Sequence, residues 1–100
     1  MAVLTSTDRL VRSPEAVLRD DFEDAAVLFH PHTAEALALS AVGVAIWKAL
    51  DGRRTLGQVA AKVAAECDAP PEAVLEDTIA FAAHLHRRLF VTPLPEPEPL

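Results

Sequence analysis

Apolar residues in the first part of the chain gather in short segments that are separated by polar and turn-forming residues, as in the strands of a small sheet. Three such stretches lie at 16–19, 25–29 and 34–39. The acidic run 20–24 separates the first two and suits a hairpin loop, and the His-Pro-His-Thr sequence at 30–33 suits a second turn. The pattern therefore predicts three consecutive antiparallel strands.

The third stretch has two different faces. Glu35, Leu37 and Leu39 fall on one side of a strand, whereas the small residues Ala34, Ala36 and Ala38 fall on the other. A strand with alanines along one face allows another segment to approach closely. We predict that this strand ends at Leu39.

After Leu39 the period changes from strand to helix. Ser40 can accept a hydrogen bond from a free backbone N–H and begin a helix that ends near Asp51-Gly52. Thr55 and Gln58 have the spacing of a capping box, which predicts a second helix from about Leu56 to Glu66. On this interpretation Arg53 and Arg54 lie in a turn between the two helices.

A third helix is predicted from Pro71, which suits the first helical position, to about Arg88. It carries two apolar rows, which is more than packing on one neighbour requires. The rows are Val74-Thr78-Phe81-Leu85 and Leu75-Ile79-Ala82-His86. One row is therefore available for a ligand.

The expected fold class is α+β: a three-stranded antiparallel N-terminal sheet followed by three helices, in a winged helix-turn-helix-like arrangement. The 100 residues suffice for one domain. We place a flexible arm at 1–9, the domain at 10–91, and an extended Pro/Glu-rich tail at 92–100.

Composition narrows the function. A net charge of −6 opposes neutralisation of nucleic-acid phosphates, and no apolar run approaches the roughly 20 residues that span a bilayer. No signal peptide is evident, and the single cysteine, Cys67, cannot form an internal disulfide. We expect a cytoplasmic protein with neither nucleic acid nor membrane as partner.

Nothing in the chain indicates catalysis, a metal or a cofactor. Residues two apart on a helix point about 200° from each other, so His84 and His86 cannot share a metal there, and His30 and His32 lie in or near a turn. Cys67 lies at the end of a helix with no evident base. We expect a protein that is not an enzyme and holds no cofactor.

The order of the segments resembles the coenzyme PQQ synthesis protein D family, whose members are stand-alone recognition elements for ribosomally made, modified peptides (RiPPs). The resemblance covers residues 14–91. Serine stands where the family has Asn after the strand leucine, and Arg88-Leu89-Phe90 replaces a glycine expected near the end of the third helix. The matching segments are Leu39-Ser40 with Val44-Ala-Ile-Trp47, Leu50-Asp-Gly-Arg-Arg-Thr55, Leu56-Gly-Gln-Val59-Ala-Ala-Lys-Val63, Pro71-Glu-Ala-Val74, and Asp77-Thr-Ile-Ala-Phe81 to Leu85.

The resemblance implies a peptide chaperone that does no chemistry itself. Such a protein binds the leader of a precursor peptide by β-strand addition. It presents the peptide to a modifying enzyme such as a radical S-adenosylmethionine enzyme or a peptide cyclase or protease. The pathway would be PQQ or other RiPP biosynthesis, and the protein would be a monomer or a weak homodimer.

The site implied by this resemblance is the edge of the third strand with one wall of the third helix. Arg87 and Arg88 would hold acidic residues of the leader nearby. The predicted peptide-binding residues are Ala34, Glu35, Ala36, Leu37, Ala38, Leu75, Ile79, Ala82, His86 and Arg87.

Other interpretations stay open. Leu75 and Ile79, taken singly, are ordinary core residues, and Trp47 is a packing anchor. The second and third helices have the geometry of a DNA-binding winged helix, although Glu72 and Glu76 lie where a recognition helix would need cations. A third alternative is an assembly module that joins biosynthetic enzymes without binding a leader.

Overall fold

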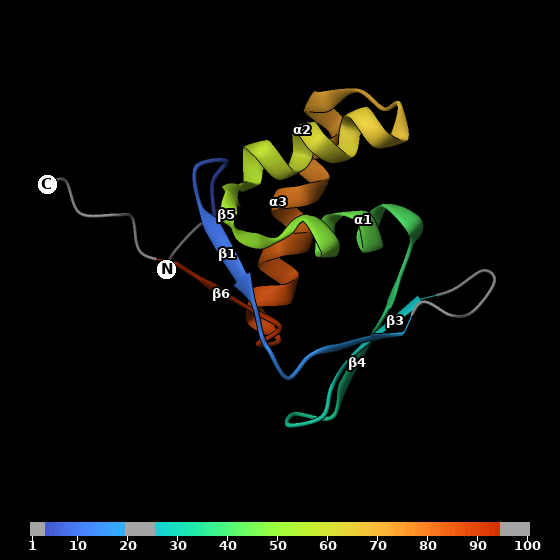
Figure 1. The fold of residues 1–100 in the computed structure, drawn as a ribbon, viewed down its shortest axis with the longest axis vertical. Coiled ribbons are helices and arrows are strands. Elements are labelled where there is room, and N and C mark those ends of the chain that lie inside the picture. Colours follow the sequence, from blue (N-terminus) through green and yellow to red (C-terminus); the bar gives the residue numbers. More distant parts are fainter. Residues whose placement is uncertain (1–3, 20–25, 95–100) are drawn as a thin grey trace, which may run out of the picture.

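The chain is described by a computed structural model over residues 4–19 and 26–94. Nine elements follow one another, with three helices and two small sheets (Figure 1). We name each sheet after its central strand: the β1 sheet has the order β5-β1-β6 and the β3 sheet has the order β2-β3-β4. The α+β class and the antiparallel N-terminal sheet are as predicted.

The β3 sheet contains the three strands that the sequence indicates. They are β2 (Val17–Arg19), β3 (Ala26–His30) and β4 (Glu35–Leu39). Both pairings are antiparallel, and β3 aligns with β4 along its full length, from Ala26 opposite Leu39 to His30 opposite Glu35. The acidic loop predicted at 20–24 lies outside the described residues.

The β1 sheet was not predicted. It consists of β1 (Arg9–Arg12), β5 (Asp51–Thr55) and β6 (Val91–Pro93), all antiparallel. Arg9, assigned to the arm, and Thr92, assigned to the tail, therefore lie in strands. Arg53 and Arg54 also lie in a strand and not in a turn between helices, because residues 51–55 pair with β1.

Residues before β1 also contact the domain. Leu4 is buried, and the carbonyls of Ser6 and Asp8 accept hydrogen bonds from the N–H groups of Gly57 and Leu56. The described part of the predicted arm thus packs against the start of the second helix.

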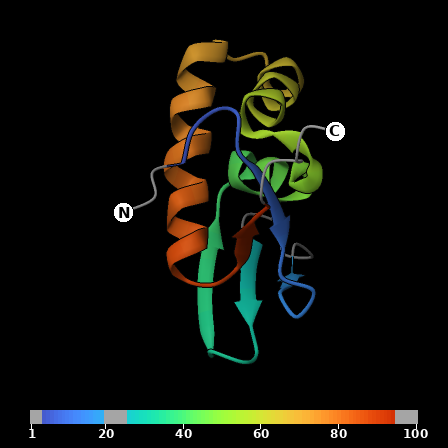
Figure 2. The same cartoon turned by 90° about the vertical axis from the view of Figure 1, so that its left-hand side faces the viewer.

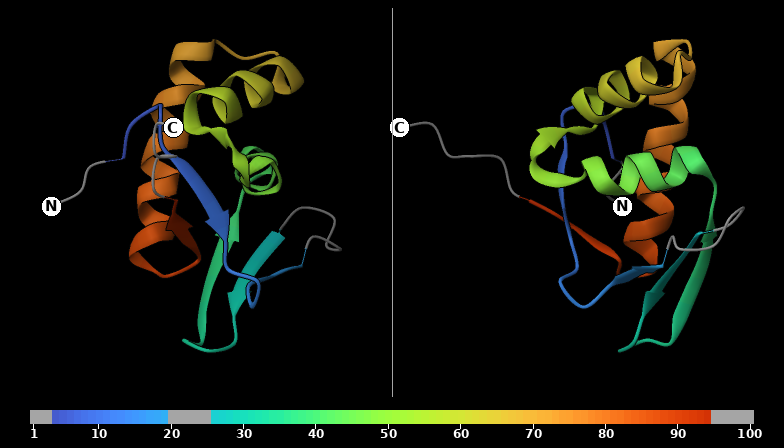
Figure 3. Two further views of the ribbon diagram at one scale, coloured as in Figure 1. Left: turned by 60° about the vertical axis from the view of Figure 1, so that its left-hand side comes forward. Right: turned by 45° about the vertical axis from the view of Figure 1, so that its right-hand side comes forward.

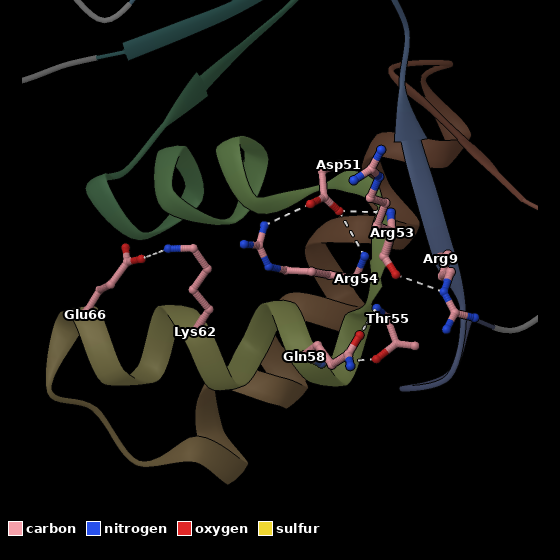
Figure 4. Close-up of polar contacts among 8 residues, drawn as sticks. All are labelled: Arg9, Asp51, Arg53, Arg54, Thr55, Gln58, Lys62 and Glu66. Carbon is pink, nitrogen blue, oxygen red and sulfur yellow. Dashed lines mark hydrogen bonds and ion pairs between the residues drawn. The ribbon is translucent and has the colours of Figure 1, made fainter.

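The helices begin where the caps predict. Ser40 Oγ accepts from Gly43 N at the start of α1 (Ala41–Ala49), and Thr55 and Gln58 form the capping box of α2 (Leu56–Cys67) (Figure 4). Pro71 begins α3 (Pro71–Arg87). The first helix ends two residues before Asp51-Gly52, because these residues enter β5.

Helices α1 and α2 lie beside α3 (Figures 1 and 3), and buried side chains of all three helices contribute to the core. Trp47 is 4% exposed and its ring meets Phe90 edge-on at 6.5 Å, which supports its interpretation as a packing anchor. His30 joins the β3–β4 hairpin to this core: its ring is buried and lies edge-on to Phe90 at 5.7 Å. The largest fully buried side chains include Phe90, Leu10, Leu28, Ile46, Leu50, Leu56 and Leu85.

The C-terminal end of α3 turns sharply. The N–H of Phe90 donates to Leu85 O and that of Leu89 donates to His86 O, which is the hydrogen-bond pattern of a Schellman motif. Leu89 takes the left-handed position of this motif with φ of 65°. Glycine is the usual residue there, so Leu89 holds a strained backbone conformation.

Candidate functional site

The β4 strand lies at an edge of its sheet. In the part of the chain that the structure describes, β4 pairs with β3 on one side and with no strand on the other. Ala36 and Ala38 are exposed, whereas Leu37 is half-buried and Leu39 is buried. The edge therefore combines backbone groups without a strand partner and small exposed side chains.

The α3 helix runs beside this edge (Figure 2). Asp77 and Phe81 line a hollow together with the end of β4, and Arg88 binds the first residue of β4. Positions 77, 81, 84 and 88 share one side of a helix, since they follow the spacing i, i+4, i+7, i+11. We call Asp77, Phe81, His84 and Arg88 the α3 row.

A hollow of about 540 Å³ lies at the Leu39 end of the edge. Phe81 and Ile46 contribute apolar atoms to it, and Asp77 contributes a carboxylate. Gly43 keeps it open, since the turn of α1 that faces Phe81 carries no side chain there. The complete lining is Ala38, Leu39, Ser40, Val42, Gly43, Ile46, Asp77 and Phe81.

An ion pair lies at the Glu35 end of the edge. Arg88 Nη1 lies 2.6 Å from Glu35 Oε2, and both side chains are about 40% exposed. Arg88 is the C-cap of α3, and its backbone N–H donates to Leu85 O. The contact therefore joins the beginning of β4 to the end of α3.

The β4 residues of the predicted site come together as expected. Ala34 precedes the strand in the turn, with φ of 62°, and its N–H donates to His30 O. Glu35, Ala36, Leu37 and Ala38 all belong to β4. Whether they contact a peptide stays a prediction.

The residues predicted for the helical wall do not line this hollow, and whether they contact a peptide stays a prediction. Residues 75, 79 and 86 are absent from the lining of the hollow; Leu75 and Ile79 are partly buried against the core, and His86 is half-buried. Ala82 is fully buried, so its methyl group is not available at the surface. Arg87 is exposed, but its neighbour Arg88 is the residue that reaches β4.

Sequence reasoning missed Asp77, Phe81 and the Glu35–Arg88 contact. Phe81 belongs to the apolar row that the predicted site leaves out, since periodicity alone does not tell which side of a helix faces a sheet. The signal was the row spacing itself, which places Asp77, Phe81 and Arg88 together.

A second hollow of about 460 Å³ lies between the β1–β2 connection and the end of α1. Trp47 and Leu50 line it, and the guanidinium of Arg12 lies over the Trp47 ring, 5.7 Å from its centre. It shares no lining residue with the hollow beside β4. We assign it no role in peptide binding.

The described residues contain no cluster of three or more His, Cys, Asp or Glu side chains placed to hold a metal ion. Among the same residues, no helix has the length and apolar character needed to cross a membrane. The beginning of α3 exposes Glu72, Glu76 and Asp77, and such carboxylates repel a phosphate backbone.

Comparisons with known proteins agree with this fold. Residues 25–91 match the family described as Coenzyme PQQ synthesis protein D (PqqD). Over 62 residues the chain is 42% identical to the PqqA binding protein of Rhizobium meliloti (strain 1021), a match that covers 62% of this chain and 61% of that protein. The matched segment thus spans less than two thirds of that relative.

Two solved structures are similar. The solution NMR structure of the PqqD truncation of Methylobacterium extorquens PqqCD, described as a functional and stand-alone RiPP recognition element, has a TM-score of 0.73 and 26% identity, over 89% of this chain and 94% of that chain. TbiB1 in complex with the TbiA(beta) leader peptide has a TM-score of 0.69 and 23% identity, over 86% of this chain and 99% of that chain. At 23% identity, the similarity to TbiB1 shows a shared fold alone.

Proposed function

The chain belongs to the coenzyme PQQ synthesis protein D family, and we propose that it binds the leader of a ribosomally made precursor peptide by strand addition to β4. The observation that carries this proposal is the open edge of β4 beside the α3 row, with a hollow at one end. The similarity to a PqqA binding protein and to a RiPP recognition element supports it.

In strand addition, the backbone and the side chains of the guest peptide would make different contributions to binding. Backbone groups on the free side of β4 would bond the guest peptide, which gives affinity without dependence on sequence. Alternate guest side chains would face α3, where an apolar one would enter the hollow next to Phe81. Selectivity would then come from the hollow and from the α3 row.

The partners form part of the proposal. A PqqA-type peptide is the first candidate guest, since the relative from Rhizobium meliloti carries that name. The protein would pass the bound precursor to a modifying enzyme in the cytoplasm, for example a radical S-adenosylmethionine enzyme, and would itself contribute no catalytic group.

Amide hydrogen exchange tests the docking edge directly. In an edge strand, alternate N–H groups point toward the partner strand and away from it, so only one set within residues 35–39 is bonded to β3. The other set should exchange rapidly in the free protein and become protected when a synthetic PqqA-type leader peptide is added. Binding measured by calorimetry without new protection in β4 would refute the proposed edge.

A pair of matched variants separates docking from stability. Ala38→Gln places a longer side chain at the mouth of the hollow and should weaken peptide binding, whereas Ala65→Gln on the exposed side of α2 should not. Equal affinities for the two variants would count against this hollow as part of the site.

A further inference from the structure

The Glu35–Arg88 ion pair lies across the end of the proposed docking edge, and the following inference rests on the proposed function. Glu35 begins the strand beside which a guest would lie, and Arg88 reaches it from the end of the opposing helix. A guest strand that pairs along all of β4 would pass between these two elements. It would therefore meet this ion pair directly.

Another carboxylate can replace Glu35 as the partner of Arg88. Both side chains are about 40% exposed, and an exposed ion pair is worth little in water because solvent screens it. A guanidinium carries five N–H donors arranged to hold a carboxylate by two bonds, whereas the contact with Glu35 uses one terminal nitrogen. Arg88 can therefore bind another carboxylate at small cost.

The charges along the α3 row favour one kind of guest. Asp77 lies at the end near the hollow, Phe81 lies beside it, and Arg88 lies at the opposite end. Along β4 the distance from Glu35 to Leu39 is four residues, or about 13 Å at the rise of a strand. Side chains four residues apart on a strand also point to the same face.

We propose that Arg88 selects leaders by exchanging its internal partner Glu35 for a carboxylate of the guest. The preferred guest is an extended peptide with a large apolar residue in the hollow and an Asp or Glu four residues away, facing Arg88. The direction of the guest strand decides whether the acidic residue precedes or follows the apolar one. Glu35 occupies Arg88 until such a guest binds.

Selection from random 12-residue peptides displayed on phage tests this without knowledge of the natural precursor. The wild-type chain should enrich peptides with the apolar-x-x-x-acidic spacing or its reverse, and Arg88→Met should lose the acidic preference. For a selected acidic peptide, Arg88→Met should weaken binding about two- to fivefold, and Glu35→Gln should strengthen it up to about fivefold.

The ion pair between Lys62 and Glu66 on α2 supplies the control, because it is also exposed and lies on another helix (Figure 4). Lys62→Met and Glu66→Gln should leave the affinity for the selected peptide unchanged. The same peptide tested with its acidic residue replaced by Gln should bind wild type and Arg88→Met equally well.

The outcomes separate this inference from the proposed function. Peptides that protect the β4 amides but show no acidic preference would overturn the exchange and leave strand addition intact. Selected peptides that bind without protecting β4 would overturn both. Acidic peptides that bind Glu35→Gln more weakly than wild type would also contradict the exchange, since Glu35 would then assist the guest.

Discussion

A β-carbon built on Gly43 of α1 would lie 3.7 Å from the Cζ atom of Phe81 on α3. This is ordinary contact distance, and its other neighbours, Leu39 and Ser40, would lie at 3.5 and 3.6 Å. A methyl group therefore fits without moving them. Because glycine inside a helix costs conformational entropy, Gly43→Ala should raise the free energy of unfolding by about 0.5 to 1 kcal/mol, measured by urea denaturation. A lower stability would show that the space is smaller than described.

A larger side chain at the same position should act on binding. Leucine at position 43 would extend into the hollow between β4, α1 and Phe81. We expect Gly43→Leu to weaken a PqqA-type leader about tenfold, since exclusion of one buried apolar side chain costs roughly 1.5 kcal/mol. Calorimetry checks this, with Gly43→Ala as the small-residue control. An unchanged affinity would exclude the hollow from the site.

The turn after α3 offers a test of stored strain. Leu89 has φ of 65° and is 63% exposed, so its side chain gains little from packing while its β-carbon disfavours the left-handed conformation. Leu89→Gly should therefore stabilise the chain by about 1 kcal/mol in urea denaturation.

Leu89→Ala serves as its control, because alanine removes the exposed side chain but keeps the β-carbon. Only the glycine variant should gain stability. If both variants gain equally, the effect comes from the exposed leucine side chain and not from backbone strain.

The elements that the sequence predicts have strong local signals. Ser40 and the Thr55–Gln58 pair each bond backbone N–H groups within a few residues, so their effect does not depend on distant contacts. The β3–β4 hairpin is similarly local, because a short turn joins two strands that follow each other in the sequence. These features position the edge of β4.

The β1 sheet depends on contacts that local patterns do not show. Residues 51–55 are mostly polar and begin with Asp-Gly, a common turn sequence, yet they form β5 because β1 lies beside them. Pro93 is tolerated in β6 because that strand lies at a sheet edge. Strand β1 pairs with β5 and β6 across separations of about 40 and 80 residues, and these long-range pairings make residues 51–55 and 91–93 strands.

The row of α3 that faces β4 could not be identified from the sequence for a related reason. Periodicity identified apolar rows on α3, but both rows are consistent with either core or ligand contact. Packing of α2 and the core against α3 buries Val74, Thr78 and Ala82, and this leaves Asp77 and Phe81 facing β4. Tertiary packing, which single-sequence periodicity does not specify, determined the row.

Thr78 within this buried face provides another prediction. Its side chain is fully buried, and its hydroxyl has no hydrogen-bond partner among the described residues. Because a buried hydroxyl without a partner costs free energy, the similarly shaped Thr78→Val should gain about 1 kcal/mol of stability.

Thr78→Ser is the control, since it keeps the hydroxyl and removes a buried methyl group. It should be less stable than wild type by about 1 kcal/mol in the same urea titration. A Thr78→Val variant less stable than wild type would mean that the hydroxyl makes a favourable hydrogen bond.

Asp51 at the start of β5 should make stability depend on pH in a narrow acidic range. The backbone N–H groups of Arg54 and Arg53 donate to Oδ1 at 2.9 Å each and hold the pKa of Asp51 below its ordinary value of 3.8; the Arg54 guanidinium acts in the same direction (Figure 4). A carboxyl with a lowered pKa in the folded state adds stability that is present above the unfolded-state pKa and is lost as the pH falls through the folded-state value. Asp51→Asn should therefore be less stable than wild type at pH 7, by an amount that stays constant down to about pH 5 and shrinks below about pH 4.

Urea denaturation at a series of pH values measures this difference, with Arg54→Met as the control. That variant keeps both backbone N–H donors, so most of the pH dependence due to Asp51 should remain. A difference between wild type and Asp51→Asn that is equally large at pH 3 and pH 7 would show that the charge of Asp51 is not what stabilises this turn.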